Sequence, residues 1–98
     1  MIAGEVIAKG KHIYFRYEGD SPSGKTKYFA VMATDGEMML GRVSWYSKWR
    51  KYCFWPFADT LYEQDCLRDI ADFIQRQTHE QRFRGNGEYE TIGTEIQK

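Results

Sequence analysis

The hydrophobic pattern of this chain changes period once, near Thr60, and that change limits the folds open to it. Before Thr60, apolar and polar residues alternate in short runs, as in β-strands with one buried face. After Thr60, apolar residues recur at the 3.6-residue spacing of an amphipathic helix: Leu67, Ile70, Ala71, Ile74 and Thr78. Short connections between the runs favour antiparallel neighbours. The sequence therefore predicts an α+β fold, an antiparallel meander sheet of four to five strands with one C-terminal amphipathic helix packed on one face.

Five segments have the alternation and punctuation of strands, and they cover residues 2–9, 11–18, 27–33, 37–46 and 49–55. The third is apolar on both faces, which indicates a central position in the sheet. Asp35-Gly36 is a hairpin signal, and Pro56 ends the last strand because proline has no backbone donor. If Trp49 and Trp55 share a face of the last strand with Lys51 and Cys53, alternation puts Arg50, Tyr52 and Phe54 on the other face.

The helix is expected to begin with Asp65 as its N-cap, because a carboxylate there can accept hydrogen bonds from first-turn amides. Gly85-Asn86-Gly87 is predicted to end it. Leu67, Ile70 and Ile74 share one helix face and are predicted to be buried against the sheet. Residues 1–84 are thus predicted to form a single α+β domain. Residues 85–98 have few apolar anchors, so we expect a tail that is frayed or adds a short extra strand.

The charge of the chain is balanced overall but segregated along it. The formal net charge is zero, so there is no global positive field. Residues 38–58 contain four basic side chains and no acid, a balance of +4, whereas residues 59–72 contain five acids and one arginine, a balance of −4. Two interpretations stay open: a basic face lies opposite an acidic face, or each segment's charges cover its own solvent side.

The two cysteines and the N-terminus bear on the cellular compartment. Cys53 and Cys66 lie inside apolar patterns, so we predict reduced, partly buried thiols that are not joined to each other. Residues 1–5 lack the basic start of a signal peptide, and no run is apolar for long enough to cross a membrane. We therefore expect a cytoplasmic protein with no membrane partner.

Catalytic and metal sites are not predicted. Cys53, Cys66, His12 and His79 are metal-ligand types, but they lack the close spacing of a zinc site. The loop at 19–24 contains glycines yet lacks the spacing of a phosphate-binding loop. No acid–base or nucleophile–base set is recognisable, so we predict no cofactor, no metal and no catalytic residue. A small hydrolase or nuclease ranks third among the functional classes.

Residues 42–57 contain seven aromatic and four basic side chains and no acid. One helix covers about one face of a sheet, so some of these rings must be exposed, and an exposed aromatic patch usually marks a binding site. We expect Trp45 or Trp49 to be substantially exposed. The alternative is that one face is core and that long basic stems lie over the remaining rings. The predicted partner-binding residues are Arg42, Trp45, Tyr46, Lys48, Trp49, Arg50 and Lys51.

Such a surface predicts a non-enzymatic binding module. A protein partner is favoured, because tryptophan, tyrosine and arginine are enriched at interface hot spots and zero net charge argues against phosphate-driven affinity. The alternative is RNA or single-stranded DNA, with bases stacked on Trp45 or Trp49 and phosphates at Lys48, Arg50 and Lys51. Exposed sheet edges also make a homodimer possible.

Three blocks of the chain carry a family resemblance: LGRVSWY at residues 40–46, WRKYCFWP at 49–56 and CLRDIADFI at 66–74. Together they resemble small uncharacterised proteins of bacteriophages and prophages, over roughly residues 38–82. The resemblance implies an accessory phage protein in the cytoplasm of a bacterial host. Such a protein would bind host or phage macromolecules, an inhibitor of a bacterial defence system being one example. The resemblance implies no activity and no site residue.

Overall fold

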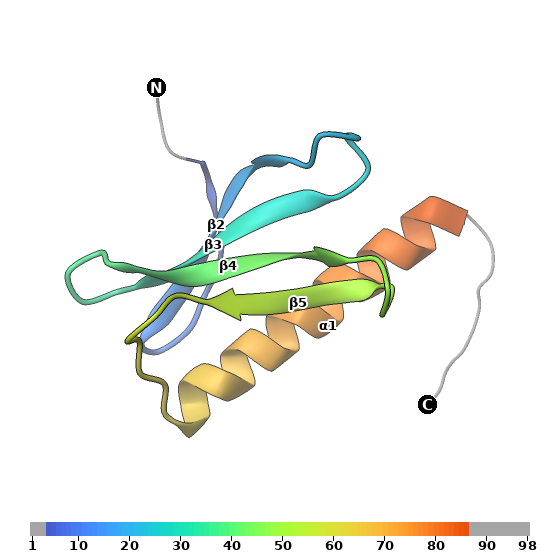
Figure 1. The fold of residues 1–98 in the computed structure, drawn as a ribbon. Coiled ribbons are helices and arrows are strands. Elements are labelled where there is room, and N and C mark those ends of the chain that lie inside the picture. The colour runs from blue at the N-terminus through green and yellow to red at the C-terminus, as the bar shows by residue number, and fades with distance from the viewer. Residues whose placement is uncertain (1–3, 87–98) are drawn as a thin grey trace.

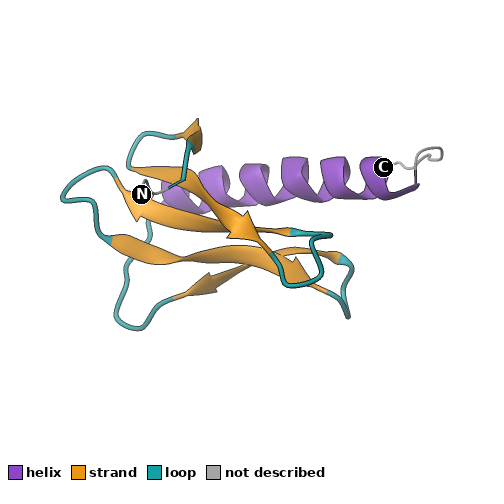
Figure 2. Ribbon diagram, turned by 90° about the horizontal axis from the view of Figure 1, so that it is seen from above, coloured by secondary structure: helices purple, strands orange, loops and turns teal. Residues whose placement is uncertain are grey.

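The computed structural model describes residues 4–86 of the chain, with five strands and one helix. In chain order they are β1 (Val6–Lys9), β2 (Ile13–Asp20), β3 (Lys27–Ala33), β4 (Met39–Tyr46), β5 (Lys51–Pro56) and α1 (Gln64–Asn86). Each strand pairs antiparallel with the next, in the order β1-β2-β3-β4-β5. α1 crosses one face of this sheet (Figures 1 and 2). The predicted α+β meander with a helix on one face is confirmed.

Strand boundaries differ from the predicted ones mainly at the turns. β3 occupies the predicted residues, whereas β2 begins and ends two residues later than predicted. β5 begins at Lys51 instead of residue 49, because residues 47–50 form the β4–β5 turn. Arg50 closes that turn in the left-handed region, at φ 56°. Residues 2–3 of the predicted first strand and residues 87–98 of the predicted tail lie outside the described residues, whereas Gly85 and Asn86 belong to α1.

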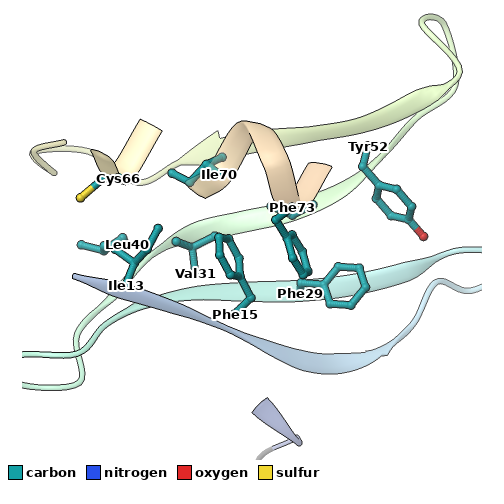
Figure 3. Packing of buried hydrophobic residues seen from close by; sticks show 10 residues of the cluster. Ile13, Phe15, Phe29, Val31, Leu40, Tyr52, Cys66, Ile70 and Phe73 are labelled. Carbon is teal, nitrogen blue, oxygen red and sulfur yellow. The ribbon is translucent and has the colours of Figure 1, made fainter. Parts of the chain in front are cut away.

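The core lies between α1 and the sheet face beneath it, and Phe73 stands at its centre (Figure 3). The Phe73 ring stacks on Phe15, with centroids 4.1 Å apart, and meets Phe29 edge-on at 5.0 Å. Aromatic pairs in these two arrangements add to the stabilisation that burial provides. The other buried residues of this cluster are Ile13, Val31, Leu40, Val43, Tyr52, Cys66 and Ile70.

The buried stripe of α1 corrects one prediction. Ile70 is buried and Ile74 is half-buried, but Leu67 is 52% exposed. The stripe that faces the sheet runs through Cys66, Ile70 and Phe73, and each residue along a helix turns by about 100°. Leu67 therefore lies about 100° from Cys66, beyond the edge of the sheet-facing side. The 3.6-residue spacing of the apolar residues fits a helix that turns Leu67 toward the sheet as well as one that turns Cys66 toward it.

The start of α1 corrects a second prediction. The helix begins at Gln64, and the carboxylate of Glu63, not of Asp65, accepts hydrogen bonds from the first-turn amides of Asp65 and Cys66. Glu63 is therefore the N-cap. Its second oxygen lies 3.3 Å from Nε2 of His12 in the β1–β2 turn. Asp65 instead lies in the first turn, where its charge suits the helix dipole, and it pairs with Arg68 at 3.2 Å.

Candidate binding face

The sheet face opposite α1 is not covered by any element within residues 4–86, and we call it the open face (Figure 2). Phe15 and Phe29 contact the helix, so the residues that flank them in β2 and β3 point to the open face. Cross-strand partners lie on the same face, which extends this assignment through β4 to β5. The open face thus carries Arg16, Tyr28, Arg42, Tyr46, Lys51, Cys53 and Trp55.

Three rings form a continuous group along the β4–β5 hairpin, and we call Trp49, Tyr46 and Trp55 the aromatic row. The Tyr46 ring lies 5.0 Å from Trp49 and 5.9 Å from Trp55, nearly perpendicular to both. Trp49 is 65% exposed and Trp55 is 46% exposed. The expected exposure of Trp45 or Trp49 is therefore confirmed for Trp49. Mutual edge contacts hold the indoles in place while much of their surface meets solvent.

Arginines lie beside the row on the same face. Arg42 is the cross-strand partner of Trp55, and its guanidinium lies 5.3 Å from the centroid of the Tyr28 ring. Arg16 occupies the same level of the sheet on β2 and pairs with Glu18 at 3.2 Å. An arginine held over an aromatic ring is restricted in its motion yet keeps its charge exposed.

Further cations gather at the β4–β5 turn. Lys48, Arg50 and Lys51 are all exposed. The guanidinium of Arg82, from the C-terminal part of α1, donates two hydrogen bonds to the Arg50 carbonyl, at 2.8 and 3.2 Å. These bonds join the β4–β5 turn to α1, and Arg82 is a fifth cation besides Arg42 and the three of the turn.

The basic side chains around the row are not neutralised by carboxylates in the described part of the chain. The ion pairs among residues 4–86 are His12–Glu63, Arg16–Glu18 and Arg68–Asp65. None of them includes Arg42, Lys48, Arg50 or Lys51. These four charges are therefore available to an anionic partner.

The structure brings together most of the predicted site residues and separates one. Arg42, Tyr46 and Lys51 lie on the open face, and Lys48, Trp49 and Arg50 lie in the adjoining turn. Trp45 lies on the opposite face, where it is partly buried and meets the Tyr52 ring edge-on at 5.3 Å. Strand alternation explains the separation, because Trp45 falls between two open-face positions.

Three contributors were not among the predicted site residues: Trp55, Tyr28 and Arg82. The alternation of residues 51–55 already places Trp55 beside Lys51, so the signal for it was present. Tyr28 lies in a strand that is apolar on both faces, which hides its direction. Arg82 is separated from Arg50 by 32 residues, and only the packing of α1 on β5 joins them.

Cys53 lies on the open face between Lys51 and Trp55, and its thiol is suited to packing rather than to nucleophilic attack. Burial raises the pKa of Cys53, and the nearby Lys51 ammonium lowers it by a smaller amount. The protonated thiol therefore predominates near neutral pH, and the thiol form is a poor nucleophile. Both cysteines are free thiols, as predicted.

Two general features of the described residues bear on the class of site. Within residues 4–86, no group of three histidine, cysteine or carboxylate side chains is placed to hold a metal ion. In the same part of the chain, no helix is long and apolar enough to cross a membrane. A shallow hollow lined by Val6, Lys9, Tyr14, Thr34 and Glu37 lies away from the aromatic row.

Residues 4–86 define an α+β protein with one sheet face that no other described element covers, and this face carries exposed rings and cations without ion pairs in that range. The chain is similar to an uncharacterised 9.3 kDa protein of Acholeplasma phage L2, with 28% identity over 61 residues. The match covers 62% of this chain and 78% of the phage protein. No protein-family model and no solved structure matches the chain. The predicted resemblance to small uncharacterised phage proteins is confirmed.

Proposed function

We propose that this chain is a phage accessory protein that acts as a non-enzymatic binding module, with the aromatic row and its neighbouring cations as the binding surface. The observation that carries the proposal is the pair of exposed indoles, Trp55 on the open face and Trp49 in the adjoining β4–β5 turn. The similarity to a phage protein supports the setting.

Exposure of large rings is costly unless a partner covers them. Each aromatic side chain can bury 150–250 Å², roughly, so the row offers several hundred Å² of contact area. Contiguous apolar patches of this size on monomers are often functional. The edge contacts of Tyr46 with Trp49 and Trp55 fix the rings before binding, which reduces the entropy lost on association.

The composition of the open face supports binding rather than catalysis. General acid–base chemistry needs groups whose pKa values lie near the working pH and which converge on one reacting atom. The carboxylate of Glu18 is already paired with Arg16, and burial raises the pKa of Cys53. The charged groups beside the aromatic row are arginine and lysine, which suit the attraction of an anionic partner.

Site-specific photo-crosslinking tests this proposal. A benzophenone amino acid replaces Trp49 in the protein expressed in bacteria during phage infection, and a matched variant carries it at Gln75, an exposed position on α1. We expect a discrete adduct with one macromolecule from position 49 and none from position 75. Equal labelling from both positions, or no adduct from position 49, would contradict the proposal.

A further inference from the structure

We infer that the partner of the open face is a single-stranded nucleic acid, whose bases stack on the aromatic row and whose phosphates contact the surrounding cations. This inference rests on the binding function proposed above and names the class of partner. It is carried by three observations: the local excess of positive charge on the β4–β5 hairpin, the lack of ion pairs to these cations among residues 4–86, and the exposed rings beside them.

The β4–β5 hairpin carries a local excess of positive charge. Arg42 and Lys51 lie on the open face, and the β4–β5 turn adds Lys48 and Arg50, while residues 38–58 contain no acid. The helix behind the sheet does not add to this excess, because α1 contains four acids and four arginines. A net charge of zero for the whole chain therefore does not describe the charge that a partner of this face would meet.

The absence of counter-charges favours phosphates over a protein surface. Arg42, Lys48, Arg50 and Lys51 form no ion pair with any other residue in the range 4–86. A protein partner would need a complementary acidic patch to avoid leaving these charges unpaired at the interface. A nucleic acid supplies one phosphate per nucleotide along its whole length, and release of its counterions favours the contact.

The rings are arranged for unstacked bases. Tyr46 meets both indoles at nearly right angles, so neither pair is stacked face to face, and the exposed surfaces of Trp49 and Trp55 remain available. Sequence-tolerant stacking of bases on aromatic side chains is the usual basis of single-strand binding.

Stacking on the aromatic row argues against a duplex. The bases of a double helix are stacked on one another, whereas the unstacked bases of a single strand can be splayed out onto aromatic side chains. An open antiparallel sheet with aromatic side chains suits a splayed single strand, because the sheet can contact several bases at once.

Fluorescence anisotropy with labelled ten-nucleotide oligothymidine and oligouridine, against a labelled duplex, tests the inference. We expect both single strands to bind more tightly than the duplex. The logarithm of the association constant should fall with the logarithm of salt concentration with a slope of about −2 to −3, as for three to four phosphate contacts.

Two variants that each remove one positive charge, one on the open face and one on α1, separate binding at the open face from general electrostatic attraction of the oligonucleotide to the protein. Lys51→Gln should weaken binding and make the salt slope shallower by about 0.7, whereas Arg76→Gln, on the exposed side of α1, should change neither. Trp55→Ala and Trp49→Ala should each weaken binding about thirtyfold with the slope unchanged. Circular dichroism of each variant checks that it is folded. Trp49→Ala is the variant least expected to disturb the fold, because Trp49 lies in the turn and not in the core.

The outcomes distinguish this inference from the function on which it rests. No binding at 50 mM salt, equal binding of the duplex, or equal losses for Lys51→Gln and Arg76→Gln would overturn the single-strand inference. If the oligonucleotides do not bind but the benzophenone at position 49 captures a protein, the chain is a binding module as proposed and its partner is a protein. If both experiments fail, the open face is not a binding surface.

Discussion

The backbone amide of Tyr52 donates a 3.0 Å hydrogen bond to Oγ1 of Thr78, and this bond ties the edge strand β5 to α1. β5 is the last strand of the sheet, so half of its amides point away from β4 and need a partner elsewhere. The phenol of Tyr52 also accepts a hydrogen bond from the Lys27 amide at 3.0 Å. Tyr52 thus fixes the hairpin that carries the aromatic row relative to the helix behind it.

Replacement of Thr78 tests this tie. Thr78→Val keeps the shape of the side chain but removes the acceptor, which leaves a buried amide without that bond, so we expect a loss of about 1–3 kcal/mol in the free energy of unfolding. Urea denaturation followed by circular dichroism measures it. The same change at Thr34 removes an exposed hydrogen bond from Oγ1 to the His12 carbonyl and leaves no buried group unpaired, so it should cost less, about 0.5 kcal/mol. Equal stability of the two variants would show that the Thr78 hydroxyl contributes nothing.

The rotation of α1 is tested by two truncations of similar size. Ile70→Ala removes a side chain that is 4% exposed and should cost about 2–4 kcal/mol. Leu67→Ala removes one that is 52% exposed and should cost less than about 1 kcal/mol. Chemical denaturation of both variants provides the comparison. A larger loss at Leu67 than at Ile70 would mean that the helix presents its other side to the sheet.

Much of the fold follows from the sequence because strand and helix periods are local properties. The position of β3 and the division of residues 51–55 between two faces depend only on alternation, and both agree with the prediction. The rotation of α1 depends on the sheet that it meets, so the helical spacing cannot decide between Leu67 and Cys66. The candidate site shows the same limit. Composition cannot decide which of Trp45 and Trp49 is exposed, and the contact between Arg82 and Arg50 forms only when α1 packs beside β5.

The N-cap is a further point at which the structure differs from the prediction, and it can be tested. Glu63→Ala removes the carboxylate that accepts from two first-turn amides and contacts His12, so we expect a loss of about 0.5–2 kcal/mol. Asp65→Ala removes an exposed pair with Arg68 and should cost about 0.5 kcal/mol or less. Thermal denaturation of the two variants side by side measures the difference. A greater loss for Asp65→Ala would restore Asp65 as the cap.

The reactivity of Cys53 should depend on pH in a defined direction. Burial raises the pKa of this thiol above its ordinary value of 9.0, and the thiolate is the reactive species. Alkylation by iodoacetamide at pH 8 should therefore be slower than for the unfolded chain, and its rate should still rise above pH 9.0. Lys51→Gln removes the charge that lowers this pKa and should slow alkylation further. Peptide mass spectrometry assigns the labelled cysteine. Faster alkylation of the folded protein would contradict the burial of Cys53.

The same raised pKa links Cys53 to stability. A thiol whose pKa is higher in the folded state binds its proton more tightly there, so its contribution to stability is complete below the pKa of the unfolded chain. That contribution is lost as the pH rises from this value through the folded-state pKa. Below about pH 8, titration of Cys53 should therefore cause no change in the free energy of unfolding.

Comparison of Trp45→Ala with Trp49→Ala tests the central claim most directly, because these indoles lie four residues apart but in different surroundings. Melting temperature and partner affinity are measured on the same preparations, with the oligothymidine or with the macromolecule captured at position 49. We expect Trp49→Ala to lower affinity by about 2 kcal/mol or more and to leave the melting temperature nearly unchanged. Trp45→Ala, which removes a ring packed against Tyr52, should lower the melting temperature by about 10 °C. If Trp49→Ala instead destabilises the fold while binding stays intact, the aromatic row is part of the core and the open face is not the binding surface.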